Sequence, residues 1–256
     1  MINMKGLSGE VICMEIGVKT DIGKVRDRNQ DAYFVSSSEE PPLFIIADGM
    51  GGHKAGETAS NMAIEITSTQ LVKGLRQSTL SDDEIQKNIE GSIDMANREI
   101  YRKSLSDESL SGMGTTTTIA YINDGKVHIG HVGDSRAYIL RENTLCQITN
   151  DHSLVEELIR NGSISAEEAK NHPQRNIITR AVGTNEYIEV DLVIKKIYRG
   201  DILLLCSDGL SNMLGDDEIR EILLGSTDMK EASQNLVELS KDRGGFDNIT
   251  VLIVKF

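Results

Sequence analysis

Short apolar segments of strand length recur along the chain, and their close spacing constrains the fold more than any other feature of the sequence. They are rich in Val, Ile, Thr and Tyr, as β-strands are. Asn123-Asp124-Gly125, which separates two of them, predicts a tight hairpin. Such short connections favour antiparallel pairing over repeated βαβ units. The predicted strands are Val11–Lys19, Ala32–Ser36, Leu43–Ala47, Thr115–Ile122, Lys126–Val132, Ala137–Arg141, Ile188–Ile197, Ile202–Cys206 and Ile249–Phe256.

Helical periodicity marks other segments. In Ser81–Ser104, apolar residues fall on one face of a helix at Ile85, Ile89, Ile93, Ala96 and Ile100. Similar spacing predicts helices after Glu57, over Met229–Leu239 and over Asp216–Leu224. No internal repeat or low-complexity linker divides the sequence, so we expect one domain over residues 1–256. The stretch 154–175 breaks the strand rhythm, and we expect it to form a helical, flap-like insertion on the surface.

The charge balance excludes some classes of partner. The 256 residues include 40 acidic and 27 basic side chains, a net charge of −13, which argues against nucleic acid and anionic membranes. No apolar run is long enough to cross a bilayer, and the first residues lack the apolar core of a signal peptide. The cysteines Cys13, Cys146 and Cys206 form no CxxC pair, which is typical of reduced thiols. We therefore expect a cytoplasmic protein without membrane insertion.

Certain aspartates stand where the predicted strands begin or end. Two of them are followed by Gly, directly after a buried apolar strand. Carboxylates gathered at such positions repel one another and are stable mainly when protonated or bound to cations. Oxygen ligands suit Mg²⁺ or Mn²⁺ rather than zinc. A single Asp-Gly is usually a turn, so it is the joint occurrence that favours a metal site. The five positions are Asp31, Asp48, Asp134, Asp208 and Asp247.

These aspartates belong to sequence blocks that resemble the metal-dependent protein phosphatases, the type 2C serine/threonine class, and in particular its compact bacterial members. The blocks follow the family's order from about residue 16 to the last residue, so the resemblance covers nearly the whole chain. They are Val25–Asp31, Ala47–His53, Gly112–Thr116, His131–Arg136, Thr149–Ser153, Ile178–Gly183, Ser207–Leu210 and Asp247–Thr250.

The resemblance implies an α+β fold, a four-layer αββα sandwich in which two antiparallel β-sheets are flanked by helix pairs. Metals would lie in a cleft at one edge of the sandwich. By motif position, Asp48 would bridge two metals and Gly49 would offer its carbonyl oxygen. Asp208 and Asp247 would complete the shell of the first metal.

Three further residues receive roles from the same resemblance. Asp31 matches an acidic residue near the metal pair that acts through water, and Asp134 matches the ligand of a third, weaker metal found in bacterial members. Arg26 matches the arginine that grips the substrate phosphate. A guanidinium fork fits two phosphate oxygens and is always charged, which explains arginine rather than lysine at this position.

The implied activity is the hydrolysis of phosphoserine and phosphothreonine in proteins. A hydroxide bridging two Mn²⁺ or Mg²⁺ ions would attack phosphorus in line, with Arg26, Asp48, Asp208 and Asp247 as the catalytic residues. The implied partners are phosphorylated proteins and a cognate bacterial Ser/Thr protein kinase, and we expect a monomer. The sequence names no physiological substrate and leaves the choice between Mn²⁺ and Mg²⁺ open.

Two departures from the family pattern leave alternatives open. Many eukaryotic members carry His directly after the metal-binding Asp-Gly, where this chain has Met50, so the general acid is either His53 or a metal-bound water. Gln30 replaces a frequent Glu, and we expect it to contact solvent or substrate rather than metal. A catalytically silent member that binds phosphoproteins or a kinase, and a hydrolase of small phosphate esters, are the competing hypotheses.

Overall fold

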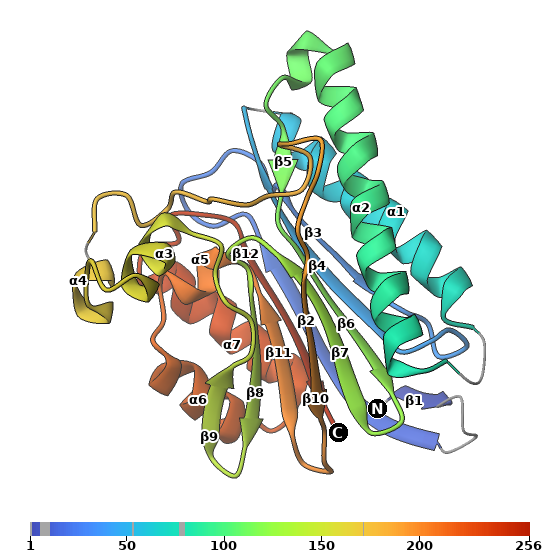
Figure 1. Ribbon diagram of the computed structural model, residues 1–256. Coiled ribbons are helices and arrows are strands. Elements are labelled where there is room, and N and C mark those ends of the chain that lie inside the picture. Colours follow the sequence, from blue (N-terminus) through green and yellow to red (C-terminus); the bar gives the residue numbers. More distant parts are fainter. Residues whose placement is uncertain (1, 6–10, 53, 77–79, 171) are drawn as a thin grey trace.

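Two antiparallel sheets pack face to face in the computed structural model, and helices cover both outer faces (Figure 1). The structure describes residues 2–5, 11–52, 54–76, 80–170 and 172–256. In the first sheet the strand order is β1-β2-β12-β11-β8-β9, and every neighbouring pair is antiparallel. Its strands are β1 (Ile2–Lys5), β2 (Val11–Asp21), β12 (Ile249–Lys255), β11 (Ile202–Cys206), β8 (Arg136–Arg141) and β9 (Thr144–Gln147).

The second sheet has the order β10-β7-β6-β4-β3, with a short strand added to the end of β4. The predicted hairpin at Asn123-Asp124-Gly125 joins β6 to β7, and the positive φ angles of Asp124 (47°) and Gly125 (66°) fit a tight turn of the primed type. The strands are β10 (Asp191–Lys196), β7 (Lys126–Val132), β6 (Thr117–Asn123), β4 (Leu43–Met50), β3 (Asp31–Val35) and β5 (Gly114–Thr115).

Apolar side chains form three layers that hold the sandwich together. One lies between the sheets, and each of the others joins one sheet to its helices. Helices α1 (Ala55–Gly74) and α2 (Asp82–Ser106) cover the second sheet. Helices α5 (Asp208–Ser211), α6 (Asp216–Gly225) and α7 (Met229–Asp242) cover the first. The expected four-layer αββα sandwich is confirmed, and none of these described helices is long and apolar enough to span a membrane.

Helix α2 shows how local sequence specifies an element. Ser81 caps it, because the Ser81 hydroxyl accepts from the Glu84 N–H and the Glu84 carboxylate accepts from the Ser81 N–H. The apolar face predicted from the sequence is fully buried against the second sheet: Ile85, Ile89, Ile93, Ala96 and Ile100.

The stretch 154–175 contains two short helices that project from the sandwich at the left of Figure 1, α3 (Leu154–Arg160) and α4 (Ala166–Lys170). Ser153 caps α3, as its hydroxyl accepts from the Glu156 N–H. An isolated bridge between Ser153 and Ile178 closes the base of this stretch.

Some elements differ from the sequence-based expectation. The strand predicted over Thr115–Ile122 is broken at Thr116, because β5 pairs with the end of β4 while Thr116 turns its hydrogen bonds toward Asp48. The strand predicted over Ile188–Ile197 is shorter, since the chain joins β7 only from Asp191. Strands β1 and β9, the helix α5 and the 3₁₀ helix η1 (Glu108–Leu110) were not predicted from their short sequences.

We predict that Gly17→Ala destabilises the protein by about 3 kcal/mol. A Cβ at Gly17 in β2 would lie 1.7 Å from the backbone oxygen of Met229, so α7 would have to move away from the sheet. Urea unfolding followed by circular dichroism measures the change. Gly91→Ala is the matched control, because nothing lies within 4 Å of a Cβ there and alanine within α2 should add about 0.5–1 kcal/mol. Equal stability of Gly17→Ala and the parent protein would contradict this packing.

Candidate metal centre

Asp48 lies at the centre of a group that we call the aspartate cluster, defined as Asp31, Asp48, Asp134, Asp208 and Asp247. Its main chain is held on one side of β4 by three hydrogen bonds. The Asp48 N–H donates to Thr116 Oγ1 (2.9 Å), and the Asp48 carbonyl accepts from the Thr116 N–H (2.8 Å) and from Thr115 Oγ1 (2.8 Å). The break between β5 and β6 therefore fixes the position of this aspartate.

The second sheet contributes a neighbour to Asp48. In the register of β3 and β4, Asp31 stands directly opposite Asp48, and opposite residues of an antiparallel pair project from the same face. The Ser207 hydroxyl donates to Asp31 Oδ2 (2.8 Å) from the end of β11. Because β11 belongs to the first sheet, this bond joins the two sheets at the cluster.

Asp208 and Asp247 reach the cluster from the first sheet. Asp208 is the first residue of α5, directly after β11, and Asp247 precedes β12. Asn248 secures this corner, because its Oδ1 accepts from the Gln30 N–H (2.8 Å) and its Nδ2 donates to the carbonyls of Ile22 (3.0 Å) and Arg28 (2.9 Å). The loop 22–30 is thereby tied to the start of β12.

Asp134 follows β7 and is 8% exposed. The glycine before it is held at both of its backbone groups by one residue: the Gly133 N–H donates to His152 Nδ1 (3.0 Å), and the Gly133 carbonyl accepts from the His152 N–H (2.8 Å). His152 immediately precedes the cap of α3. The turn that carries Asp134 is thus connected to the projecting stretch 154–175.

Burial and mutual repulsion raise the pKa values of four aspartates, Asp31, Asp48, Asp134 and Asp208. Burial raises the pKa of Asp31 and of Asp134 to about 6. The pKa values of Asp48 and Asp208 rise further, first because of burial and then because each lies near the charges of the other aspartates. Charged carboxylates are therefore unfavourable here unless positive charge is supplied.

The cluster has the chemistry of a site for hard divalent cations. Asp31 Oδ1, Asp134 Oδ1 and Asp208 Oδ1 are buried and accept no hydrogen bond from the residues that the structure describes, although a buried carboxylate oxygen ordinarily has a partner. All donors in the cluster are oxygens, which Mg²⁺ and Mn²⁺ prefer. Among the described residues, no three Asp, Glu, His or Cys side chains already surround a common point. The chemistry of the donor set nevertheless fits such ions.

Gly49 and Arg26 lie beside the cluster. A Cβ at Gly49 would lie 2.1 Å from the carbonyl oxygen of Gly56, so only glycine allows α1 to start this close to β4. Arg26 is half exposed, and its Nη2 lies 2.6 Å from Asp247 Oδ2. Gln30 contacts the backbone nearby, since its carbonyl accepts from the Gly49 N–H (3.1 Å). His53 lies outside the described residues.

Comparisons with known proteins agree with this arrangement. Residues 24–243 match the sequence pattern of protein phosphatase 2C. The chain belongs to the protein phosphatase 2C family. It is 42% identical over 243 residues to the serine/threonine phosphatase stp of Listeria monocytogenes, which covers 94% of this chain and 96% of the relative. The family resemblance predicted from the sequence is confirmed.

Solved structures of this phosphatase family share the fold. A serine/threonine phosphatase of S. agalactiae superposes with a TM-score of 0.89 and 39% identity, over 95% of this chain and 99% of that one. The catalytic domain of the phosphatase PstP, in complex with two manganese ions, superposes with a TM-score of 0.82 and 33% identity, over 94% and 97% of the two chains.

Sequence reasoning placed all five aspartates of this phosphatase 2C family member at one site, and the structure brings them together. Their roles as ligands remain predictions. Sequence reasoning did not identify the polar residues that hold these aspartates in place through hydrogen bonds: Thr116, Ser207, Asn248 and His152. All four stand within the family blocks identified in the sequence, and that position was the available signal.

We predict that Asp134→Asn stabilises the protein in EDTA at pH 7.5 by about 1–3 kcal/mol. The pKa of Asp134 is raised from 3.8 to about 6 in the folded state. Between these values the folded protein holds more protons than the unfolded chain, so this residue makes stability fall as the pH rises. An amide cannot ionise, so the advantage should shrink toward pH 4. Urea midpoints at several pH values measure it.

The control for this prediction is Glu39→Gln, which makes the same chemical change at an exposed position. It should leave the urea midpoint nearly unchanged across the pH range. A variant Asp134→Asn that is no more stable than the parent at pH 7.5 would show that this carboxylate is not under electrostatic strain.

Proposed function

We propose that this chain is a metal-dependent protein phosphatase that hydrolyses phosphoserine and phosphothreonine in proteins. The observation that carries the proposal is the aspartate cluster, in which carboxylates from both sheets lie together and three buried oxygens have no hydrogen-bond partner among the described residues. Such a cluster costs stability without bound cations, so its presence points to a role in binding them. The relatives named as serine/threonine phosphatases support the substrate class.

We propose that the cluster residues bind metal ions. Asp48, Asp208 and Asp247, with the carbonyl of Gly49, would hold two core ions, and Asp31 would act beside them. Asp134 would hold a third ion. We propose Mn²⁺ or Mg²⁺, supported by the oxygen donors and by the two manganese ions of PstP. When bound, such ions lower the pKa of coordinated water and offset the negative charge that develops on the phosphate.

Arg26 would bind and orient the phosphate. In the structure its guanidinium pairs with Asp247, so it is already directed at the cluster from the rim. A phosphate dianion offers two oxygens to the fork of an arginine, and it would replace part of this pairing. Hydrolysis then transfers oxygen from water to phosphorus, while the serine or threonine oxygen leaves with a proton. Both His53 and metal-bound water remain candidates for donating that proton.

We predict that Asp208→Asn lowers phosphate release from a phosphothreonine peptide by at least about 100-fold in the presence of Mn²⁺. The substitution removes one negative ligand but keeps the size of the side chain and its place at the start of α5. Malachite green detection of phosphate measures the rate, and EDTA should abolish it in the parent protein.

Asp216→Asn is the matched control, because Asp216 is the first residue of α6 but lies exposed on the surface. It should retain full activity. Phosphate release that persists in EDTA would refute the metal-dependent mechanism. If the folded parent protein released phosphate from no substrate, the hypothesis of a catalytically silent, phosphoprotein-binding family member would be favoured. If it hydrolysed small phosphate esters faster than phosphopeptides, the hypothesis of a small-ester hydrolase would be favoured.

We predict that Arg26→Lys raises KM for the phosphopeptide by about 10-fold, with a smaller effect on kcat. Lysine keeps the positive charge but cannot form two parallel hydrogen bonds to one phosphate. Initial rates over a range of peptide concentrations separate the two constants. Arg98→Lys, on the exposed face of α2, is the control and should leave both unchanged. An unchanged KM in Arg26→Lys would remove Arg26 from the phosphate site.

The remaining proposals concern the whole protein. We propose one catalytic domain over residues 1–256 that acts as a monomer in the cytoplasm, with 154–175 as a flap near Asp134. The free thiols of Cys146 and Cys206 support the cytoplasmic location, and the projecting helices α3 and α4 support the flap.

We propose that the opposing enzyme is a cognate Ser/Thr protein kinase. Light scattering tests the monomer, and phosphoprotein levels in cells with and without this chain test the kinase relation.

A further inference from the structure

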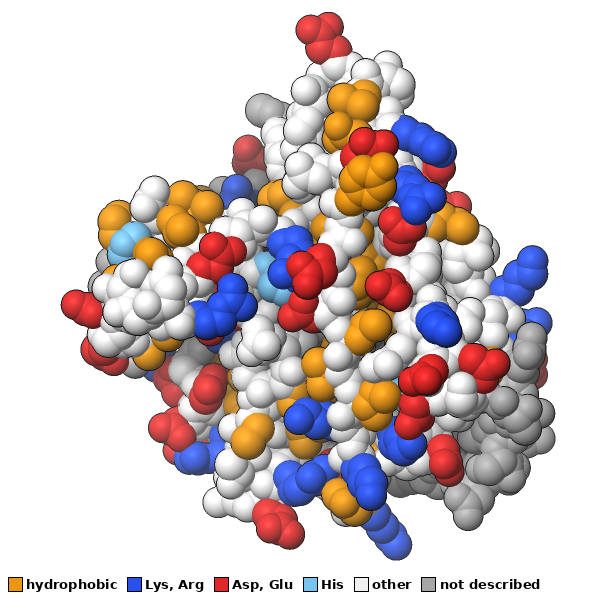
Figure 2. Space-filling view, in the orientation of Figure 1, with side chains coloured by type: hydrophobic (Ala, Val, Ile, Leu, Met, Phe, Trp, Pro, Cys, Tyr) orange, Lys and Arg blue, Asp and Glu red, His pale blue; other side chains and the backbone are white. Residues whose placement is uncertain are grey.

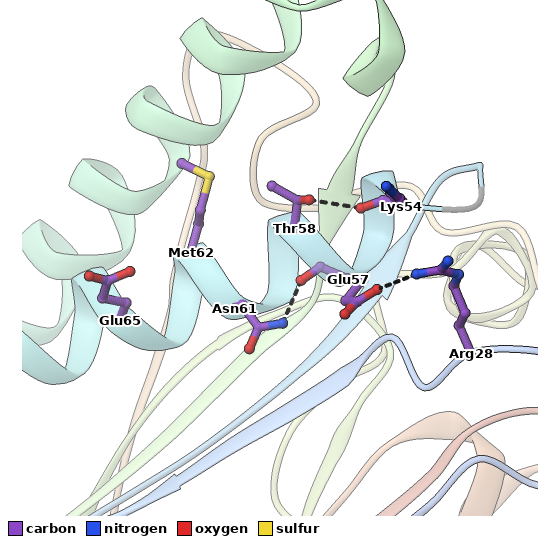
Figure 3. Close-up of a pocket in the computed structure, with 7 residues that line it drawn as sticks. All are labelled: Arg28, Lys54, Glu57, Thr58, Asn61, Met62 and Glu65. Atoms are coloured by element: carbon purple, nitrogen blue, oxygen red, sulfur yellow. Dashed lines mark hydrogen bonds and ion pairs between the residues drawn. The ribbon is translucent and has the colours of Figure 1, made fainter.

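A groove whose lining includes two cations, Arg28 and Lys54, runs along α1. It consists of two adjoining pockets of about 370 and about 590 Å³, which share Arg28, Lys54 and Thr58 as lining residues. We call it the Arg28–Lys54 groove. Figure 3 shows Arg28 extending toward the first turn of α1, with Lys54 at the start of that helix and Asn61, Met62 and Glu65 farther along it.

Two of the segments that line the groove are close to cluster aspartates in the sequence or through a hydrogen bond. The Arg28 carbonyl accepts from Asn248 Nδ2 (2.9 Å), and Asn248 follows the predicted ligand Asp247. Gly52, which lines the larger pocket, comes shortly after β4, the strand that carries Asp48. A peptide whose phosphorylated residue lay at the cluster could therefore continue into the groove.

The larger pocket of the groove is positive although the protein as a whole is strongly negative, whereas the smaller pocket also contains Glu57 and Glu65. Among the described residues, the larger pocket is lined by Arg28, Lys54 and one acid, Asp107, whose Oδ1 already accepts from the Ser109 N–H (3.0 Å) and from Ser109 Oγ (2.6 Å). The ammonium of Lys54 pairs with no acid among the described residues. In a chain of net charge −13, such a pocket attracts anions.

Among the described residues, the groove contains one ion pair, and this pair is weak enough to be exchanged. Arg28 Nη1 lies 3.3 Å from Glu57 Oε2, and both side chains are about half exposed (48% and 44%). Exposed pairs of this kind contribute little to stability. A substrate anion could therefore take the place of Glu57 on the guanidinium while Lys54 approaches it from the start of α1.

We propose that the Arg28–Lys54 groove is a substrate subsite for a second anionic group, which lies a few residues from the phosphorylated serine or threonine. The shared chemistry is a carboxylate or phosphate held by one guanidinium and one ammonium. It comes either from an acidic residue or from a second phosphorylated residue of the same protein. The inference rests on the proposed phosphatase function and names the class of phosphoprotein that this site prefers.

The test compares kcat/KM for phosphothreonine peptides on a neutral scaffold, with Mn²⁺ present. Glutamate, phosphoserine, lysine or alanine is placed in turn at each position up to about four residues on either side of the phosphothreonine. The length of an extended peptide, about 3.3 Å per residue, sets this range. At one or more positions, we expect the parent protein to prefer glutamate or phosphoserine over alanine by about 5-fold, and to disfavour lysine. The glutamate and phosphoserine arms distinguish the two sources of the anion.

Charge reversal makes the test specific. In Arg28→Glu combined with Lys54→Glu, the preference at those positions should invert, so that the lysine peptide becomes the better substrate. A gain of this kind cannot come from misfolding. Glu57→Gln should increase the preference for acidic peptides, because it frees Arg28. The matched control is Lys73→Glu combined with Arg76→Glu, at the far end of α1, which should keep the preference of the parent protein.

The outcomes separate the subsite from the phosphatase function. Turnover with equal rates for glutamate, lysine and alanine at every position would overturn the subsite and leave the function standing. The same would follow if the Lys73 and Arg76 variant changed the preference as much as the Arg28 and Lys54 variant. Absence of phosphate release from every peptide would overturn both.

Discussion

The apolar layer between the two sheets is the constraint on which the site depends. Its fully buried members come from both sheets, among them Phe44 and Ile46 of β4 and Leu203 and Leu205 of β11. Burial of such side chains is the main favourable contribution to folding. Because β4 and β11 end close together once this layer has formed, the aspartates that follow them are brought together despite their charges. Packing thus imposes an arrangement that electrostatics alone would oppose.

The supporting hydrogen bonds explain why the aspartates do not simply turn away. Thr116 holds the main chain of Asp48, Ser207 holds the carboxylate of Asp31, and Asn248 ties the loop 22–30 to β12. The repulsion is expressed instead as raised pKa values and unpartnered oxygens. On the face shown in Figure 2, most acidic side chains are interspersed with Lys and Arg. The acids that share one buried position are therefore a distinct subset of a broadly acidic chain.

How much of the structure could be predicted from the sequence depended on whether the interactions involved are local or long-range. The hairpin at Asp124-Gly125 and the buried face of α2 follow from local turn preference and helical period, so both could be predicted. The aspartates could be found because each lies at a strand boundary within a family block. The break at Thr116 could not, because it arises from a bond to Asp48, 68 residues away in sequence. The pairing of Arg26 with Asp247 could not be predicted from local sequence patterns either, because the two residues are 221 residues apart.

Arg26 and Arg28 show how one short loop can serve two recognition tasks. They are two residues apart, yet Arg26 pairs with Asp247 beside β12 whereas Arg28 pairs with Glu57 on α1. Asn248 holds this loop at the carbonyl of Arg28 and the N–H of Gln30, so the backbone does not have to be ordered when a substrate arrives. Each guanidinium already faces a carboxylate and can exchange it for a substrate anion. The same fixed loop would then recognise both the phosphate at the cluster and the charges of the substrate residues on either side of the phosphorylated residue.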